Sequence, residues 1–465
     1  MSDRPNVLLV ITDQHRGDAV GADPDCPRVD GDPVVHTPTI DRLAGTGTLF
    51  RRAYSPVPSC VPARRCLWTG RTPANCDATY YHGREWAFDS PMPERLRDSG
   101  YQTRLVGKHH GRPMRNHCGF EHLVLHDGLS GERDDYERWL DRRSGGAYGE
   151  VSHGIDRNSW DPRPSHLPEH EHPTTWTTER ALDFLDRRDP TRPFFLTLSY
   201  VRPHQPFDPP RPYWDMYVDE SLPEPHMGEW VDRHADQVPD NPATDAWLAD
   251  LPDRIVHRAR AGYYGLITQI DHQLGRVVDA IPSDTVVLFT ADHGEMLGDH
   301  QHWRKTYAYE GSARIPFIVS RPDDSDGAVV DAPVGLTDVA PTVLDAAGMA
   351  VPEVMDGRSV LSLRDGDSAR RSAYHGEHGP CYADTNACQF LVDERWKYIW
   401  NPVTGSELLF DLENDPGETS DLSTDPEAAE HREAFRAELA RRLADRPEGF
   451  VEDGSLRPVE PGAWR

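Results

Sequence analysis

Lysine is almost absent from this sequence. Lys108, Lys305 and Lys397 are the only lysines among 465 residues, whereas lysine and arginine together number 50. Aspartate and glutamate number 78, so the formal net charge is −28. Phosphates would be repelled by such an acidic surface, and we therefore expect no nucleic acid among the partners of this protein.

The scarcity of lysine beside abundant carboxylates predicts a halophilic protein. In a salt-rich cytoplasm the Debye length falls to about 3 Å at 1 M salt, which screens the repulsion between carboxylates. A GC-rich genome would also replace lysine with arginine, but it would not explain the excess of Asp and Glu. A lysine that is kept in this background is a candidate functional residue.

Long hydrophobic runs are missing as well. The longest apolar run covers residues 7–11, far short of the roughly 20 residues that a membrane span needs. This run lacks the basic segment and the small-residue cleavage site of a signal peptide. We therefore expect a cytoplasmic protein that does not interact with membranes.

Cysteine pairs are also lacking. The seven cysteines are irregularly spaced and form no C-x-x-C motif, which favours reduced thiols and argues against a structural zinc site. Hydrophobic residues nevertheless make up 37% of the chain, enough for a sizeable core. The length predicts one large domain and a smaller one.

Four short apolar runs end in polar, chemically capable residues. Uninterrupted apolar runs of about 4–8 residues are typical of strands buried on both faces of a parallel sheet. In open α/β sheets, ligands bind beyond the carboxyl ends of the strands. The sequence thus predicts an α/β fold with a large, mostly parallel central sheet flanked by helices. The runs are 7–11 before Asp13, 101–106 before Lys108, 194–201 before His204, and 286–289 before Asp292.

The remaining segments divide the chain into two predicted domains. Residues 1–370 are predicted to form the α/β domain that carries the four polar strand ends, and apolar positions that recur every three or four residues over 263–281 predict a helix within it. Segments 128–175 and 208–250 are interpreted as insertions over the sheet. Residues 371–465 form a smaller α+β domain, with short antiparallel strands at 389–392, 396–400 and 407–412 and a helix opened by Asp425-Pro426. Lys397 is expected to be solvated at a strand edge.

The most distinctive local motif is C-V-P-A-R at residues 60–64, followed by Thr69-Gly70. Pro62 suits the first turn of a helix, which would place Cys60 among free backbone N–H groups at a helix N-terminus. Arg64 adds a positive charge, so Cys60 is a candidate nucleophile. The alternative is a buried structural thiol.

This motif resembles the C-x-P-x-R…T-G signature of the type I sulfatases in the alkaline phosphatase superfamily. The resemblance implies that Cys60 is oxidised by a formylglycine-generating (sulfatase-maturating) enzyme to formylglycine, whose hydrate is the nucleophile. It extends over nearly the whole chain, in the order of the family. The further matching segments are P-N-V-L-L at 5–9 with Asp13, G-Y at 100–101 with G-K-H-H-G at 107–111, P-H-Q-P at 203–206, D-H-G-E at 292–295 with G-D-H at 298–300 and Lys305, R-I-P at 314–316, and W-K-Y-I at 396–399.

The resemblance also implies a site for one divalent metal ion. Its ligands would be Asp13, Gln14, Cys60, Asp292 and His293. Hard oxygen ligands favour Ca²⁺, Mg²⁺ or Mn²⁺, and the usual ion of the family is Ca²⁺. Many relatives carry Asp where this chain has Gln14. That departure, with His293 after Asp292, is more similar to the branch of choline sulfatases and phosphonate monoester hydrolases.

The implied reaction is a double displacement with Cys60, Arg64, Lys108, His110, His204 and Lys305 as catalytic residues. Arg64 holds the nucleophile and His204 protonates the leaving oxygen. His110 then removes a proton so that sulfate is released, while Lys108 and Lys305 neutralise charge on the transferred group. The expected substrate is a small-molecule or carbohydrate sulfate ester.

Two other interpretations stay open. The same machinery would serve a phosphonate monoester or phosphodiester hydrolase. A protein of another class would bind a metal and an anion without ever oxidising Cys60, although it would have no need of both an acid and a base. The motifs do not identify the alcohol part of the ester, because the candidate pocket segments 128–175 and 208–250 lie outside them. The sequence does not indicate the oligomeric state either.

Overall fold

The computed structural model describes residues 4–128, 133–366 and 370–464. Its central sheet has eight strands in the order β11-β4-β10-β9-β1-β8-β6-β7. Strand β10 is antiparallel to both neighbours and all other pairs are parallel, so the predicted mostly parallel sheet is confirmed. The strands are β1 (Asn6–Asp13), β4 (Thr48–Phe50), β6 (Gln102–Gly107), β7 (His122–Leu125), β8 (Phe194–Pro203), β9 (Thr285–Ala291), β10 (Phe317–Ser320) and β11 (Ala328–Val330).

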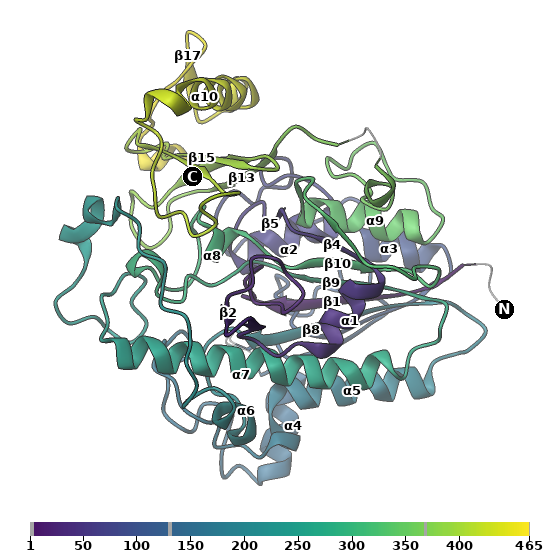
Figure 1. The fold of residues 1–465 in the computed structure, drawn as a ribbon. Coiled ribbons are helices and arrows are strands. Elements are labelled where there is room, and N and C mark those ends of the chain that lie inside the picture. The colour runs from purple at the N-terminus through teal and green to yellow at the C-terminus, as the bar shows by residue number, and fades with distance from the viewer. Residues whose placement is uncertain (1–3, 129–132, 367–369, 465) are drawn as a thin grey trace.

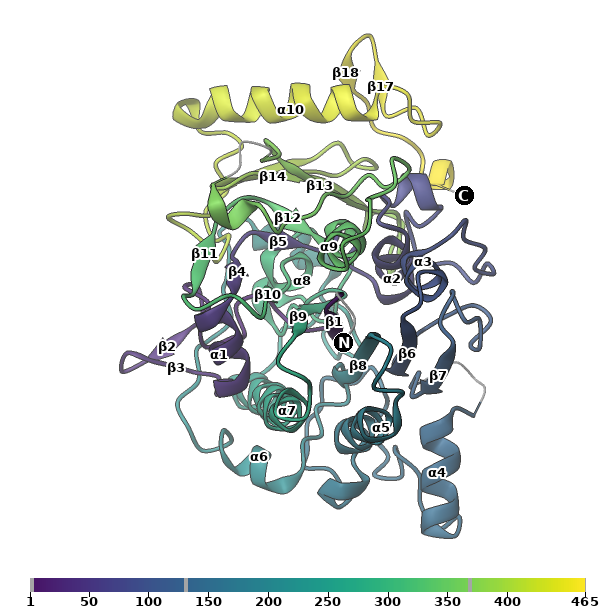
Figure 2. The ribbon, with the colours of Figure 1, turned by 90° about the vertical axis from the view of Figure 1, so that its right-hand side faces the viewer.

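Helices cover both faces of the sheet, as Figure 2 shows. One face carries α1 (Pro38–Thr46), α5 (Pro173–Arg187) and α7 (Asp253–Val278). The other carries α2 (Cys60–Thr69), α3 (Met92–Asp98) and α9 (Val339–Ala346). The helix predicted over 263–281 is the second half of α7, which begins earlier and ends slightly sooner.

Strand β1 shows why the apolar runs are uninterrupted. Val7 and Leu9 pack into the core shared with α2, α3 and α9, whereas Leu8 and Val10 pack into the core shared with α1, α5 and α7. Because successive side chains of a strand point to opposite faces, a strand with helices on both sides needs an apolar residue at every position.

Shorter elements connect this framework. The predicted insertion 128–175 contains α4 (Asp135–Ser144) and the 3₁₀ helix η2 (Glu169–Glu171), with residues 129–132 outside the described part. Segment 208–250 contains α6 (Arg211–Asp215) and η3 (Val231–Gln237). No helix within the described residues is long and apolar enough to cross a membrane. The remaining short elements include β2 (Arg28–Val29), β3 (Asp32–Pro33), β5 (Ala53–Tyr54), β12 (Val334–Gly335) and α8 (Glu310–Ala313).

A second, antiparallel sheet follows near the C-terminus (Figure 1). Its order is β13-β14-β15-β16, with bounds Tyr374–His378, Cys388–Val392, Trp396–Trp400 and Glu407–Asp411. The three predicted strands are confirmed, and β13 is an additional one. Helix α10 (Ala429–Leu443) packs Phe435, Leu439 and Leu443 onto one face of this sheet. The other face packs Phe390 and Phe410 against Tyr54 of the larger unit.

The expectation that Lys397 is solvated is wrong. Lys397 lies in β15 and is fully buried. Its Nζ donates to Glu310 Oε1 at 2.8 Å and lies 3.0 Å from Glu418 Oε1. It also sits 5.5 Å from the ring centre of Tyr54 and 5.8 Å from that of Phe390. Because Glu310 begins α8, this lysine ties the C-terminal sheet to the larger unit.

We predict that Lys397→Met destabilises the protein by about 3–5 kcal/mol, because it removes the buried cation that Glu310 and Glu418 share. The measurement is the free energy of unfolding from denaturant titration. Arg441→Ala is the matched control, since it removes an exposed ion pair with Glu438 on α10 and should leave stability unchanged. Equal stabilities of the two variants would contradict this account of Lys397.

Candidate active site

The four polar strand ends predicted from the sequence meet at one edge of the central sheet. Asp13 ends β1, Lys108 follows β6, His204 follows β8 and Asp292 follows β9. These strands are neighbours and run parallel, so their carboxyl ends face the same side. Each of the four residues is at least nine-tenths buried.

Cys60 is the first residue of α2 and is 5% exposed. Its Sγ lies 3.1 Å from His293 Nε2. Burial and the Asp13 carboxylate would raise the pKa of the Cys60 thiol, but Lys108, Lys305 and His293 together lower it below its usual value. The helix N-terminus further favours negative charge here. Cys60 is therefore held in a buried, electropositive position.

Four side chains converge as the candidate metal site. Ligand atoms of Asp13, Cys60, Asp292 and His293 all lie within 4.8 Å of one another, and all four residues are buried. Asp13 Oδ1 has no hydrogen-bond partner. A buried carboxylate oxygen without a partner is costly, and a cation at this point would satisfy it.

The protonation of His293 supports the same interpretation. Its Nδ1 lies 2.9 Å from the carbonyl oxygen of Gly294 and must donate to it, so Nε2 is the atom that can hold either a proton or a metal ion. Nε2 lies 3.6 Å from Asp13 Oδ1 and 3.7 Å from Asp292 Oδ1. Although burial lowers the pKa of His293, Asp292 and Cys60 raise it overall. The cluster thus attracts a positive charge, which either a proton or a metal ion can supply.

Gln14 lies beside this cluster in a left-handed backbone conformation, with φ of 69°. Its backbone N–H donates to Asp292 Oδ1 at 3.1 Å. Its side-chain Oε1 accepts a hydrogen bond of 2.6 Å from Lys305 Nζ. The amide nitrogen donates to Gln205 Oε1 at 2.7 Å and also contacts Glu295. Gln14 therefore connects the cluster to Lys305.

Two buried ion pairs flank the cluster. Arg64 Nε donates to Asp292 Oδ2 at 2.9 Å, and both side chains are fully buried. Arg64 also donates to Ser199 Oγ and to the carbonyl oxygen of Lys108. Lys108 Nζ contacts Asp13 Oδ2. Burial alone would raise the pKa of Asp13, but Lys108 and the neighbouring cations hold it well below its usual range.

Lys305 and His204 form a direct contact on the other side of Gln14. Lys305 Nζ lies 2.8 Å from His204 Nε2, while His204 Nδ1 lies 2.9 Å from the carbonyl oxygen of Gln205. Nδ1 must therefore carry the proton, and Nε2 accepts from the ammonium group. Burial, and then Lys305, lower the pKa of His204 well below its ordinary value.

His110 also has a left-handed backbone, with φ of 59°. Asp127 Oδ1 holds it by accepting the backbone N–H groups of His109 and His110 at 2.7 and 2.8 Å. The ring Nδ1 of His110 is buried and has no partner. Burial, followed by Lys108 and Arg64, lowers the pKa of His110 well below its usual value, so this imidazole is a neutral proton acceptor.

Sequence reasoning missed three residues of this arrangement. Glu295 is fully buried and accepts from Gln205 Nε2 at 2.8 Å in addition to contacting Gln14. Ser199 lies within β8 and binds Arg64. Asp127 follows β7, so the rule that polar residues follow strand ends could have found it. Glu295 lay inside a quoted motif, but its role depends on contacts with residues far away in the sequence.

Comparison with known proteins agrees with this geometry. A sequence model of the sulfatase family matches residues 5–349, and a model of the N-sulphoglucosamine sulphohydrolase C-terminal region matches residues 298–445. The chain belongs to the sulfatase family. This sulfatase is 37% identical to an arylsulfatase of Clostridium perfringens, over 97% of each chain. It is an enzyme that hydrolyses sulfate esters, in the alkaline phosphatase superfamily.

Other relatives of the sulfatase include both groups anticipated from Gln14. A choline-sulfatase of Rhizobium meliloti is 28% identical over 91% of this chain and 83% of its own. The solved phosphonate monoester hydrolase of Agrobacterium radiobacter superposes with a TM-score of 0.78 at 26% identity, covering 95% of this chain and 96% of that one. The family implies a divalent metal and a formylglycine, and the buried cluster around Asp13 is a suitable metal site.

Proposed function

We propose that this sulfatase acts through a formylglycine formed at Cys60 beside one divalent metal ion. The proposed metal ligands are Asp13, Gln14, Asp292 and His293 together with the modified residue 60. The observation that carries the proposal is that Cys60 Sγ lies 3.1 Å from His293 Nε2, next to the unpartnered oxygen of Asp13. When present, the hydrated aldehyde and the metal ion supply the activated hydroxyl nucleophile.

Lys108 and Lys305 would neutralise charge on the sulfate group, while Arg64 would hold the nucleophile. Arg64, Lys108 and Lys305 all lie in the site and are at least nine-tenths buried. In a chain of net charge −28 the surrounding field repels anions, so this attraction has to be local. Because these cations are shielded from water, each interacts more strongly with the negative charge that develops in the transition state.

His204 and Lys305 would act together on the leaving oxygen. Since His204 Nε2 accepts from Lys305 in this arrangement, the imidazole has no proton of its own to give at that atom. The proton that reaches the leaving oxygen would therefore start on the Lys305 ammonium group. His110, neutral and with an unpartnered ring nitrogen, would take up a proton in the second half of the reaction.

Three finer features are part of the proposal. The oxygen-rich ligand set supports Ca²⁺, with Mn²⁺ or Mg²⁺ as alternatives. A formylglycine-generating enzyme would be the maturation partner, and a small-molecule or carbohydrate sulfate ester the substrate. The separate core between the C-terminal sheet and α10 supports a boundary near residue 370 between two domains.

The test of the function is mass spectrometry of the peptide that contains residue 60, from protein purified from its native host. We expect an aldehyde in place of the thiol, detected by a lower peptide mass and by trapping with a hydrazine reagent. The buried Cys66 and Cys76 are internal controls, which should remain thiols. An unmodified Cys60 in active protein would overturn the mechanism.

Lys305→Met tests the cation side of the site. The variant keeps most of the side-chain volume but removes the charge that contacts Gln14 and His204. We expect kcat to fall by about 100-fold or more, as for loss of one group that stabilises transition-state charge, with little change in the thermal unfolding midpoint. The control is Arg441→Ala, remote on α10. A near-normal kcat in Lys305→Met would refute the proposed role.

A phosphonate monoester or phosphodiester hydrolase is the second candidate function, supported by the phosphonate monoester hydrolases among the structural relatives. We expect a higher kcat/KM for 4-nitrophenyl sulfate than for 4-nitrophenyl phenylphosphonate, which has the same leaving group. A much higher kcat/KM for the phosphonate would contradict the sulfatase proposal and support the phosphonate monoester hydrolase.

The acidic surface supports a salt-rich cytoplasm as the proposed location. We predict that the thermal unfolding midpoint rises between about 0.1 and 2 M KCl, because salt screens the repulsion between carboxylates. Sucrose at the same osmolality is the control, since it does not screen charge. A midpoint that falls with KCl would show that screened ion pairs matter more and would contradict the halophilic interpretation.

A further inference from the structure

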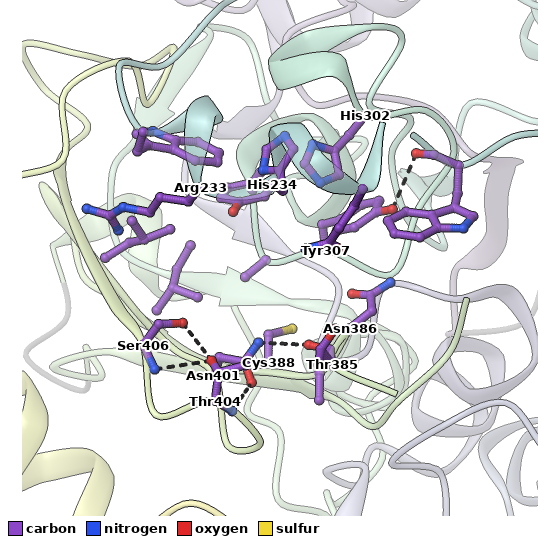
Figure 3. A pocket seen from close by; sticks show the side chains of 18 residues that line it. Arg233, His234, His302, Tyr307, Thr385, Asn386, Cys388, Asn401, Thr404 and Ser406 are labelled. Carbon is purple, nitrogen blue, oxygen red and sulfur yellow. Dashed lines mark hydrogen bonds between the residues drawn. The ribbon is translucent and has the colours of Figure 1, made fainter. Parts of the chain in front are cut away.

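A cavity of about 270 Å³, apart from the catalytic centre, lies between segment 230–247, loop 302–309 and the C-terminal sheet (Figure 3). His234, His302 and Tyr307 line one side, and the edge of the C-terminal sheet with Asn386 lines the other. Loop 302–309 also carries Lys305, whose side chain reaches away to Gln14 and His204. The cavity and the catalytic centre therefore share one loop but are separate sites.

The cavity lining offers no uncompensated charge. Arg233 is the one formally charged residue among the described lining residues, and its Nη2 pairs with Asp421 Oδ2 at 2.6 Å. Burial lowers the pKa of His302 well below its usual value and also lowers that of His234. Both imidazoles are therefore neutral near pH 7. A neutral ligand therefore fits this cavity better than a sulfate ion does.

Three side chains of the lining each keep a hydrogen-bond acceptor. The carbonyl oxygen of His300 lies 2.7 Å from His302 Nδ1 and 3.3 Å from His234 Nε2, so both of these nitrogens donate. The other ring nitrogen of each histidine is left as an acceptor. Asn386 Nδ2 donates to Thr306 Oγ1, which leaves the Asn386 side-chain oxygen as a third acceptor. Such a set is suited to a ligand with several hydroxyl donors.

Aromatic and aliphatic groups make up the rest of the lining. Trp230 stacks on Tyr309 with ring centres 4.8 Å apart, and the His302 ring meets the Tyr307 ring at 4.4 Å. Ile399 and Leu408 from the C-terminal sheet complete the apolar surface. Aromatic faces beside a few well-placed acceptors match a sugar ring, whose C–H face is apolar and whose hydroxyl groups donate.

The aromatic surface continues from the cavity towards the catalytic centre. The rings of Tyr307 and Tyr382 have centres 6.5 Å apart, and Tyr382 stacks on Trp247 at 6.0 Å and 13°. Arg304, next to Lys305 in the chain, lies 4.8 Å from the Tyr382 ring centre. Since Lys305 contacts Gln14 and His204, the Arg304–Tyr382 contact places this ring beside the loop that enters the catalytic centre.

We propose that this cavity binds an uncharged sugar ring of an oligosaccharide whose sulfated unit lies at Cys60. The second part of this inference, that a sulfated unit occupies the catalytic centre, rests on the proposed function. It assigns the substrate to sulfated oligosaccharides rather than to small aryl or alkyl sulfates. The cavity would thereby add affinity that a monosaccharide sulfate cannot use.

The first test is binding of unsulfated disaccharides, measured by calorimetry with maltose, cellobiose, lactose and chitobiose as probes. We expect at least one to bind the parent and the Cys60→Ser variant equally well, and not to be displaced by inorganic sulfate. His234→Ala should weaken that binding about 5- to 10-fold, since it removes one acceptor and one ring edge. His122→Ala, an exposed histidine on the far edge strand β7, is the matched control and should bind as the parent does.

Ala308→Leu is a second variant, chosen because it fills the cavity instead of removing a packed side chain. Ala308 lines the cavity, so the larger residue should abolish disaccharide binding. A thermal unfolding midpoint close to that of the parent would confirm that the variant folds. Binding of none of the probes, binding unaffected by either variant, or displacement by inorganic sulfate would each overturn the proposal.

Kinetics with sulfated substrates separate this proposal from the proposed function. His234→Ala should raise KM for a sulfated tetrasaccharide about 5- to 10-fold relative to KM for 4-nitrophenyl sulfate, with kcat unchanged. An equal effect on both substrates would contradict a subsite. If the parent binds disaccharides but hydrolyses no sulfate ester, the proposed function fails while the sugar site stands.

Discussion

Two buried ion pairs, Asp13 with Lys108 and Asp292 with Arg64, are the interactions on which the site depends. Carboxylates gathered at the ends of parallel strands would repel one another and any anionic ester. A buried charge without a partner costs several kcal/mol, so each pair holds its elements firmly in place. Arg64 stands on α2, and its contact with Asp292 therefore fixes Cys60, one turn earlier on the same helix.

Buried ion pairs also attach the C-terminal sheet to the larger unit. Lys397 enters the interface between the two units and neutralises Glu310 and Glu418, which aromatic residues surround. Glu310 belongs to α8, directly after loop 302–309, so the same contact steadies the loop that carries Lys305. All three lysines are thus buried beside carboxylates or amides, in a chain whose exposed basic groups are arginines. The proposed sugar cavity lies at this same junction.

Much of the framework could be predicted because the relevant signals are local. Strands β1, β6, β8 and β9 are continuous apolar runs, and α7 shows a helical period. Strands β4 and β10 carry too few residues for a pattern, and the reversed direction of β10 depends on its neighbours. Strand β13 is as long as the predicted β14, but its sequence is polar with a central glycine. The burial of Lys397 was not predicted, because a position in a strand does not reveal whether an acidic partner lies opposite.

The sequence by itself determined the order of the chemical groups: a cysteine at a helix start, and acids, lysines and histidines after strands. These features follow from local chain geometry and from motifs of contiguous residues. Only the tertiary structure decided that Asp127 holds His110, that Glu295 contacts Gln14, and that Lys305 lies against His204. Such contacts join residues far apart in the chain, and they form only when burial removes water as the competing partner.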